Sequence, residues 1–421
     1  MARRRLLARE RLAGLHQSDA HFDRRNHRTG RTARRTIVSR QSDDRARVAP
    51  RHKRFKLTNV ALVHDYLNQR GGAERVFAHI ARAWPDAPVY TALYDERAVG
   101  DLIAPDRVRV SALARVPFAN RCFRALAPFY PRAFERFDLS GFDVVVSSTT
   151  AWAKGVRLAP GAIHVCYINT VSRFAFAYDE YVRSPLARPL VNRLAAWDRL
   201  AATRPTRFVA NSTNVANRIR EHYGREADVL HCPVDVDRFT PGNGAGDYFI
   251  VVSRLLPYKR LELAIAAAAL AGIRLFVAGT GPAERSLRRL ARGTTTTMLG
   301  FVSDAQLNEL LGDARAAIVP GEEDFGLVPL EAAAAGRPTI AYRGGGALET
   351  IVEGETGAFF DEPNAESLAA ALRNFGAARF NPERLRAHAE KFAPAQFIER
   401  LRAIVQRVYR EAHRATADVP K

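Results

Sequence analysis

The chain has few cysteines and no long apolar segment. Cys122, Cys166 and Cys232 are far apart in the 421 residues and form no CxxC pair, so we expect reduced core thiols and neither a disulfide framework nor a cysteine metal site. The longest apolar run, residues 263–273, is mostly alanine and is too short to span a bilayer. No apolar core follows the arginines near the start, so no signal peptide is predicted. These absences favour a cytoplasmic protein.

Positive charge is concentrated near the start of the chain. Residues 1–56 hold 18 Lys/Arg and 5 Asp/Glu, a net +13 of the chain's +20, so the other 365 residues carry only +7. The segment has little apolar periodicity, so burial cannot offset its ordering entropy, and we expect a disordered basic extension. It could tether the protein to nucleic acid or anionic lipid, or it could be dispensable. A dispensable extension is the favoured interpretation, and nucleic acid is not an expected partner.

The rest of the chain alternates between short apolar runs and helix-forming segments. Runs such as FDVVVS (142–147) and IHVCYI (163–168) are typical of buried parallel strands. The alternation starts again after residues 233–246, which are rich in proline and glycine and typical of a linker. We therefore predict an α/β protein with two doubly wound, Rossmann-like parallel-sheet domains that face a cleft, residues 57–232 and 247–393.

The segment 394–421 contains a long amphipathic helix. Phe397, Leu401 and Val405 recur on one of its faces. We expect this helix to pack back on the first domain; the alternative is an ordinary terminal helix of the second domain.

Residues 320–338, PGEEDFGLVPLEAAAAGRP, carry the strongest signal for a binding site. An apolar run ends at the first proline, three acids follow, and strong helix formers run to the last glycine and proline, which predicts a strand, a loop and a helix. In an open α/β sheet such a loop lies at the carboxyl end of the strand, where ligands bind, and the helix start offers N–H groups to an anion. A carboxylate accepts two hydrogen bonds from a vicinal diol, so Glu323 and Glu331 could each hold a sugar ring with a phosphate between them. The stretch therefore indicates a nucleotide sugar.

Two cations and a glycine pair add to this signal. Arg254 and Lys259 follow the first strand of the second predicted domain, and across a turn they can converge on a diphosphate and neutralise the charge that builds on it as a leaving group. Gly71 and Gly72 end a polar loop after the first strand of the chain and could bring backbone N–H groups close to a phosphate. Taken alone, a plain tight turn is the better interpretation of the glycine pair.

Arginines and aromatic residues are interleaved between residues 108 and 137. On short helices this pattern could face a membrane surface or an acidic, lipid-linked acceptor. The alternative, equally favoured, is that the aromatic side chains are core and the arginines are solvated.

Six sequence stretches carry a family resemblance. They are VHDYLNQRGGAERV (63–76), FDVVVSSTTAWAKGV (142–156), FVANSTNVANRI (208–219), PVDVDRFTP (233–241), SRLLPYKRLELAI (253–265) and EDFGLVPLE (323–331). With these, residues 60–412 resemble the retaining glycosyltransferases of family 4, which have the GT-B fold, and particularly the bacterial O-antigen and exopolysaccharide mannosyltransferases. The last stretch is the E-x7-E motif of that family.

The resemblance implies a reaction and a set of site residues. The expected reaction moves a hexose, expected to be mannose from GDP-mannose, to a lipid-linked or growing saccharide in cell-surface polysaccharide synthesis. The implied roles are donor diphosphate binding by Arg254 and Lys259, ribose binding by Glu331, donor sugar contact by Glu323, sugar and phosphate contacts from the N–H groups of Phe325, Gly326 and Leu327, and closure from the first domain by Gly71 and Gly72. Retention would come from front-face attack, with the leaving phosphate helping to take the acceptor's proton and without a nucleophilic glutamate.

The resemblance also implies that no metal or other cofactor is needed. Asp235 and Asp237 form a DxD pattern, which binds metal in some sugar transferases, but it lies in the predicted linker and we discount it. The expected location is the cytoplasm, with peripheral contact to the anionic inner face of the plasma membrane.

One position departs from the family pattern. Relatives usually have a histidine followed by Thr-Pro after the strand at 163–168, and this chain has Asn169, Thr170 and Val171. In the family that histidine contacts the donor sugar or the acceptor; asparagine can donate and accept a hydrogen bond but cannot titrate, so the departure bears on substrate choice and turnover. Asn169 and Asp65 are the candidate contacts of the acceptor or sugar. The alternatives are a nucleotide-sugar epimerase of the same fold and an inactive or accessory homologue.

Overall fold

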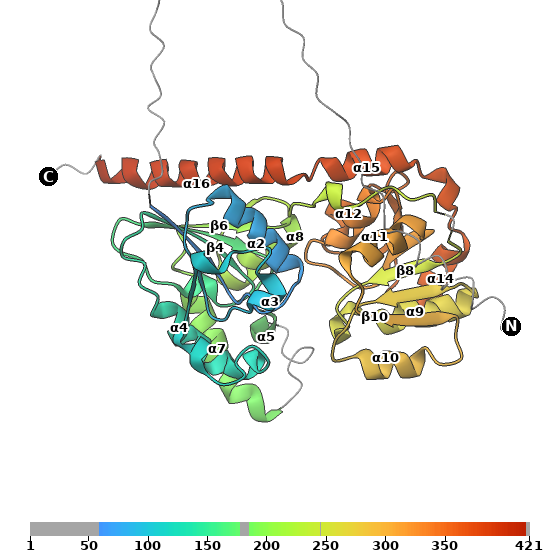
Figure 1. Ribbon diagram of the computed structural model, residues 1–421, viewed down its shortest axis with the longest axis horizontal. Helices are drawn as coiled ribbons and strands as arrows, with labels where there is room; N and C mark the ends of the chain where they lie inside the picture. The colour runs from blue at the N-terminus through green and yellow to red at the C-terminus, as the bar shows by residue number, and fades with distance from the viewer. Residues whose placement is uncertain (1–58, 177–184, 245, 418–421) are drawn as a thin grey trace, which may run out of the picture. The chain divides into compact units, whose positions relative to one another are not determined.

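The computed structural model contains two parallel β-sheets with helices packed around them (Figure 1). It describes residues 59–176, 185–244 and 246–417. Both sheets belong to one compact unit, Lys56–Lys421, and every strand pair in them is parallel. This confirms the predicted fold class of two doubly wound parallel sheets. The predicted extension at residues 1–56 lies outside the described residues.

The first sheet has the strand order β3-β2-β1-β4-β5-β6-β7. Its strands are β1 (Val60–His64), β2 (Val89–Thr91), β3 (Val108–Val110), β4 (Val144–Thr149), β5 (Ile163–Ile168), β6 (Arg207–Ala210) and β7 (Ala227–Val229). Every residue of β1, β4 and β5 is buried, which is why β1, β5 and the first three residues of β4 are mostly apolar. The order reverses between β1 and β4, and ligands of doubly wound sheets bind beyond the carboxyl ends of strands at such a reversal.

The helices of this half connect its strands. They are α2 (Gly72–Ala83), α3 (Glu96–Val99), α4 (Tyr130–Glu135), α5 (Arg173–Phe176), α7 (Arg188–Ala201) and α8 (Thr213–Tyr223), with the 3₁₀ turns η1 (Pro105–Arg107), η2 (Ala112–Arg115), η3 (Phe123–Phe129), η4 (Ala153–Gly155) and η5 (Pro185–Ala187). Helix α8 begins after a capping serine, because the Ser212 side chain accepts a hydrogen bond from the Val215 N–H.

The second sheet has the order β10-β9-β8-β11-β12-β13, which reverses between β8 and β11. Its strands are β8 (Phe249–Val252), β9 (Leu275–Ala278), β10 (Thr296–Gly300), β11 (Ala316–Val319), β12 (Thr339–Tyr342) and β13 (Gly357–Phe360). Its helices and turns are η6 (Val236–Arg238), η7 (Pro257–Lys259), α9 (Leu261–Ala271), α10 (Glu284–Leu290), α11 (Asp304–Asp313), α12 (Leu327–Ala334), α13 (Ala347–Thr350), α14 (Ala365–Arg373), η8 (Ala377–Arg379) and α15 (Pro382–Glu390). The loops after β8 and β11 therefore lie at the switch point of this sheet.

The last helix, α16 (Pro394–Ala417), contacts α2 and β5 of the first half (Figure 1). The Phe397 ring meets the Tyr167 ring edge-on with centroids 5.7 Å apart, and Arg402 Nε donates a 2.9 Å hydrogen bond to the carbonyl of Ala83, where α2 ends. A cation near a helix C-terminus is favourable for the helix dipole. Among the described residues, no helix has both the length and the apolar character needed to traverse a membrane.

The structure differs from the sequence expectations at two places. Residues Val108–Val110 form an edge strand paired with β2, whereas short helices were expected from residue 108 onward. Three residues are too few for periodicity to separate strand from helix. The second difference is Cys122, which is exposed rather than core; Cys166 and Cys232 are buried, and all three are free thiols.

Candidate active site

The loop after β11 connects the sheet to helix α12 and is shaped by glycine. Gly326 has φ +88°, a conformation that favours glycine, and it immediately precedes the helix. A second glycine packs against the loop: a side chain at Gly346 would place its Cβ 2.3 Å from Cα of Phe325. The Gly346 N–H also donates a 2.8 Å hydrogen bond to the carbonyl of Glu323. The loop path therefore depends on close backbone approach at these positions.

Lys259 and Glu323 meet at the switch point of the second sheet. The ammonium of Lys259, from the loop after β8, lies 2.5 Å from Oε2 of Glu323, and the two side chains are 15% and 21% exposed. Burial disfavours the charged lysine, but Glu323 and Tyr258 more than offset it and raise the pKa of Lys259. Arg254 lies in the same loop with an exposed side chain. The structure thus places a fixed ammonium beside the first acid of the E-x7-E motif.

Glu331 lies in helix α12 with its carboxylate largely buried. Its side chain is 13% exposed, and burial raises its pKa although Arg238 and Arg75 oppose the shift. Within the described residues the carboxylate accepts no hydrogen bond, and its one ion pair there, to Arg238, is 4.0 Å long. Buried polar groups in proteins are almost always hydrogen-bonded, so this carboxylate is suited to a ligand that brings hydroxyl donors.

The glycine pair of the first half lies against the start of α12. Gly71 is the N-cap of α2, and its N–H donates a 3.0 Å hydrogen bond to Glu74. A Cβ at Gly72 would lie 3.2 Å from Cδ1 of Leu327, the first residue of α12. Phe325 is buried and stacks on His231 with ring centroids 5.4 Å apart. The structure therefore brings Gly72, Phe325, Gly326 and Leu327 together across the two halves.

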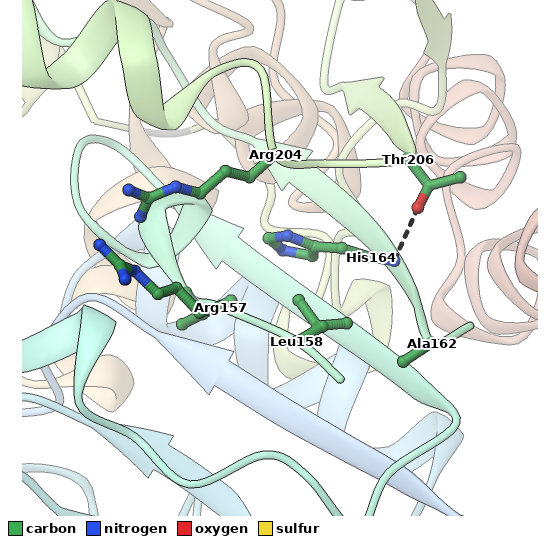
Figure 2. Close-up of a pocket in the computed structure, with 7 residues that line it drawn as sticks. Arg157, Leu158, Ala162, His164, Arg204 and Thr206 are labelled. Atoms are coloured by element: carbon green, nitrogen blue, oxygen red, sulfur yellow. Dashed lines mark hydrogen bonds between the residues drawn. The ribbon is translucent and has the colours of Figure 1, made fainter. Parts of the chain in front are cut away.

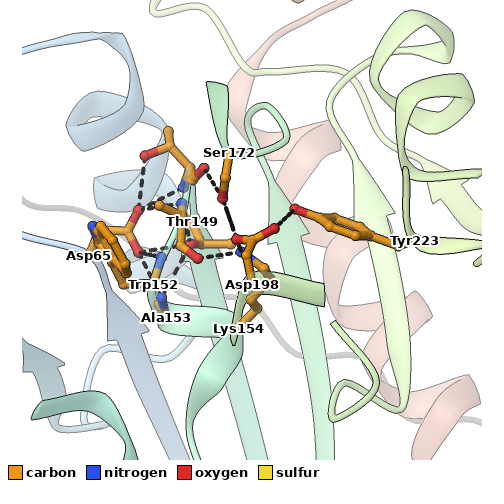
Figure 3. Close-up of polar contacts among 10 residues, drawn as sticks. Asp65, Thr149, Trp152, Ala153, Lys154, Ser172, Asp198 and Tyr223 are labelled. Atoms are coloured by element: carbon orange, nitrogen blue, oxygen red, sulfur yellow. Dashed lines mark hydrogen bonds and ion pairs between the residues drawn. The ribbon is translucent and has the colours of Figure 1, made fainter. Parts of the chain in front are cut away.

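Asp65 is used differently from the sequence expectation. Its side chain is buried, and its two oxygens accept six hydrogen bonds of 2.7–3.0 Å from the turn that follows β4 (Figure 3). The donors are the N–H groups of Thr150, Ala151, Trp152 and Ala153 and the hydroxyls of Thr149 and Thr150. A carboxylate with this many protein donors has no lone pair left for a sugar. Asp65 holds the turn rather than a ligand.

Asn169 also lies at the carboxyl end of the first sheet. Its side-chain amide donates 3.1 Å and 3.4 Å hydrogen bonds to Ser148 Oγ and the Thr149 carbonyl, and its own carbonyl accepts a bond from Asn211. Asn169 is 9% exposed, so its position after β5 is well anchored.

Asp324, the last acid of the loop, was assigned no role from the sequence. Its carboxylate faces the first half and pairs with Arg173 and Arg218 at 2.7 Å and 2.5 Å. Neighbouring acids in a run carry no sequence signal that separates a ligand contact from an ion pair. Only the fold shows that Glu323 and Asp324 point to different partners.

Two cavities lie away from these residues. One, of about 470 Å³, opens at the amino end of β5 between Arg157, His164 and Arg204 (Figure 2). Burial lowers the pKa of His164 to about 3, so the ring is neutral at physiological pH. The other, of about 740 Å³, is lined by Tyr94 and Asn120 among others. No predicted site residue lines either cavity.

Two doubly wound parallel sheets are the architecture of the GT-B fold. At the switch point of the second sheet lie an acid–lysine pair and a carboxylate that accepts no hydrogen bond from the described residues. The model of Glycosyltransferase Family 4 matches residues 70–238, and the model of Glycosyl transferases group 1 matches residues 236–392. Together they cover most of the chain, which belongs to glycosyltransferase family 4.

Curated relatives include D-inositol 3-phosphate glycosyltransferases. That of Geodermatophilus obscurus is 34% identical over 298 residues, covering 62% of this chain and 64% of the relative, so the chain spans less than two thirds of it. That of Mycolicibacterium smegmatis is 28% identical over 313 residues, 65% and 69% of the two chains.

Solved structures share the fold. Anabaena Alr3699/HepE in complex with UDP superposes with a TM-score of 0.59 at 17% identity, over 83% of this chain and 100% of that chain. Sucrose-phosphate synthase from Thermosynechococcus elongatus has a TM-score of 0.63 at 15% identity, over 84% and 99%. At these identities the likeness concerns the fold alone.

Proposed function

We propose that the protein is a retaining glycosyltransferase that moves a hexose from a nucleotide sugar to a saccharide acceptor. The observation that carries the proposal is the largely buried Glu331 carboxylate, which accepts no hydrogen bond within the described part of the chain and lies in the helix that follows the loop of the Lys259–Glu323 pair. A ribose diol would supply the missing donors, and a diphosphate would meet Lys259, Arg254 and the first N–H groups of α12.

In the proposed reaction the bond between the sugar C1 and the phosphate oxygen breaks while the acceptor oxygen bonds to C1 on the same face. The acceptor proton passes to the leaving phosphate, and the nucleoside diphosphate departs. Lys259 and Arg254 stabilise the negative charge that develops on it, which is the largest electrostatic demand of the step. Glu323 holds the hexose hydroxyls, and Gly72 completes the site opposite Leu327. No metal or other cofactor enters this scheme.

We propose mannose as the sugar and GDP-mannose as the donor, with a lipid-linked or growing saccharide of cell-surface polysaccharide synthesis as the acceptor. The family stretches that resemble O-antigen and exopolysaccharide mannosyltransferases support this choice. The second candidate is a UDP-sugar donor with an inositol phosphate acceptor. It is favoured by the similarity to D-inositol 3-phosphate glycosyltransferases and to the Anabaena protein in complex with UDP.

Thermal unfolding with a donor panel tests the proposal. GDP-mannose, UDP-glucose, UDP-galactose and UDP-N-acetylglucosamine are added to the full-length protein, and a ligand at 100 times its Kd is expected to stabilise it by about 2.7 kcal/mol. Glu331→Ala should abolish this shift, whereas Glu309→Gln, at an exposed position of α11, should preserve it. No shift with any donor, or an unchanged shift in the Glu331 variant, would refute the site. Donor turnover without an acceptor would favour an epimerase.

We also propose that the acceptor is reached at an anionic membrane on its cytoplasmic side. Residues 107–134 contain six arginines and no acid. Phe118 and Phe129 are 72% and 57% exposed there, with Arg115 and Arg121 exposed as well. Exposed aromatic and basic side chains on one segment suit a surface of acidic lipids.

Vesicle sedimentation separates this contact from simple charge. The Phe118→Ser/Arg121→Gln variant should bind phosphatidylglycerol vesicles about tenfold more weakly, because one basic residue near the surface contributes about 1 kcal/mol and the aromatic ring adds to it. The matched control is Phe301→Ser/Arg292→Gln, which removes an exposed phenylalanine and an exposed arginine from the second half. Equal binding by the two variants would contradict the proposed surface.

A further inference from the structure

Asp324 lies between Glu323 and Phe325 in the loop after β11, but its carboxylate faces the first half of the protein. Glu323 pairs with Lys259 of its own half at 2.5 Å. The Asp324 carboxylate instead receives three bonds from the first half: Arg173 at 2.7 Å, Arg218 at 2.5 Å and the Thr170 hydroxyl at 2.9 Å. The side chains of Glu323 and Asp324 are therefore bound by different halves of the protein.

The backbone of the same loop is held by the start of helix α8. Ser212 Oγ donates a 2.6 Å hydrogen bond to the Asp324 carbonyl, and the Asn214 side chain donates a 3.3 Å bond to the Glu323 carbonyl. In return, Glu349 of the second half accepts bonds from the Thr213 and Asn214 N–H groups at 2.9 Å and 3.2 Å. A carboxylate at a helix N-terminus is favourable for the helix dipole, so this exchange stabilises both partners.

The ion pairs of Asp324 are strong because their side chains are largely shielded from water. The side chains of Asp324, Arg173 and Arg218 are 20%, 18% and 24% exposed. Burial alone would raise the pKa of Asp324, but the two guanidinium groups lower it below its usual value, so the carboxylate stays ionised at every working pH. Arg173 also stacks over the Tyr258 ring at 4.4 Å, next to Lys259 in the chain. It therefore touches both loops of the switch point.

The segment of the first half that carries Thr170 and Arg173 is itself held by buried contacts. Ser172, between Thr170 and Arg173, donates a hydrogen bond to Asp198, which pairs with Lys154 at 2.5 Å (Figure 3). Lys154 and Asp198 are 1% and 0% exposed. A satisfied buried ion pair has one arrangement, so the loop that carries Arg173 has a fixed position.

We propose that Asp324 is a positioning residue that keeps Glu323 on the donor sugar by fixing the loop to Arg173 and Arg218. This rests on the proposed function for the role of Glu323. The Glu323 charge also acts on Arg173, so without the Asp324 charge we expect Glu323 to leave Lys259 and pair with that guanidinium. A displacement of about 1 Å in a reacting group can cost on the order of 100-fold in rate. Glu331 has its ion pair with Arg238 and not with Arg173 or Arg218, so its contact with the nucleotide should not depend on the Asp324 charge.

The test compares Asp324→Asn with Glu322→Gln in the full-length protein. Glu322 pairs with the same Arg218 at 2.6 Å but is 46% exposed, so its variant removes an adjacent negative charge without releasing Arg173. The first measurement is amide hydrogen exchange of residues 320–327 and 211–218 without ligand. We expect at least tenfold faster exchange in both segments for Asp324→Asn and no change for Glu322→Gln.

The second measurement separates positioning from general damage. Stabilisation of the protein by UDP and GDP is compared with turnover of the donor identified in the panel. We expect kcat to fall about 100-fold in Asp324→Asn while the Kd of the nucleotide diphosphate stays within about twofold, and Asp324→Glu to recover part of the turnover. Equal exchange in the two variants, turnover within twofold of the original protein, or parallel loss of nucleotide affinity and melting temperature would each overturn the proposal. If no nucleotide sugar is bound by the unaltered protein, the proposed function fails, and hydrogen exchange alone still decides how Asp324 acts.

Discussion

Asp198→Asn is expected to destabilise the protein strongly, because it leaves a buried lysine without its counter-charge. Lys154 is 1% exposed and lies 2.5 Å from Asp198, whose other oxygen accepts a 2.7 Å bond from the Tyr223 hydroxyl. Removing one partner of such a pair costs about 3–5 kcal/mol, because the remaining charge cannot reach water. The asparagine keeps the shape and one acceptor, so the loss reports the charge rather than a cavity.

Urea denaturation followed by tryptophan fluorescence measures this loss. Trp152 and Trp197 lie within this region, with ring centroids 5.8 Å apart, so they report the environment of the pair. The double variant Lys154→Met/Asp198→Asn removes the stranded charge and is expected to recover the free energy of unfolding to within about 1–2 kcal/mol of the original protein. A loss below about 1 kcal/mol in the single variant, or no recovery in the double variant, would refute the reasoning.

The pH dependence of this effect has a definite sign. Burial disfavours the charged Lys154, but Asp198 and Tyr223 outweigh it and raise the pKa of Lys154 above that of a free lysine, about 10.4. The stabilisation is therefore complete below that unfolded value and is lost as pH rises through the folded value. The contribution of Lys154 to the stability of the original protein should therefore be constant from pH 6 to 9. The loss in Asp198→Asn should shrink as pH rises over that range, because burial without the Asp198 charge favours the neutral amine.

Three further predictions concern the site and the thiols. Glu331→Gln should raise the ligand-free stability at pH 7 by about 0.5–2 kcal/mol, because burial raises the pKa of that carboxyl and disfavours its ionised form in the folded protein. The same variant should abolish stabilisation by the donor. A lower free energy of unfolding, measured by urea denaturation, would contradict this prediction. Gly346→Ala should reduce stability by about 1–3 kcal/mol and turnover with it, since the new Cβ would meet loop backbone at 2.3 Å, and an unchanged melting temperature would count against it. Native protein should react with one equivalent of a thiol reagent, at exposed Cys122, because burial raises the pKa of Cys166 and Cys232 to about 12; labelling of three thiols before unfolding would show that the two are accessible.

Much of the fold followed from local chemistry. The strand at 163–168 was predicted with its observed bounds, since a fully buried parallel strand must be apolar on both faces. Helix α9 ends where Gly272 adopts φ +66°, a conformation that glycine adopts without strain at the end of a helix. The edge strand β3 escaped prediction because its short sequence alternates over only three residues, and pairing with β2 decided its conformation.

The candidate site was predictable as a set of residue types and not as a set of contacts. Glu323, Glu331 and Lys259 were singled out because acids and cations after parallel strands are the groups that bind sugars and phosphates. Asp65 belonged to the same pattern, yet its carboxylate oxygens accept hydrogen bonds from the turn after β4, which lies 84 or more positions along the chain. Such long-range hydrogen bonds have no local signature.

By itself the sequence determined the alternation of strands and helices, the two parallel sheets, and the acid–loop–helix stretch before α12, because each depends on the preferences of neighbouring residues. Only the tertiary structure decided which partner each acid of that stretch pairs with. Glu323 pairs with Lys259 at the end of β8, whereas Asp324 pairs with Arg173 and Arg218 of the other sheet. The reason is that charge pairing depends on distance in space, and the residues concerned are separated by 64 to 151 positions in the chain.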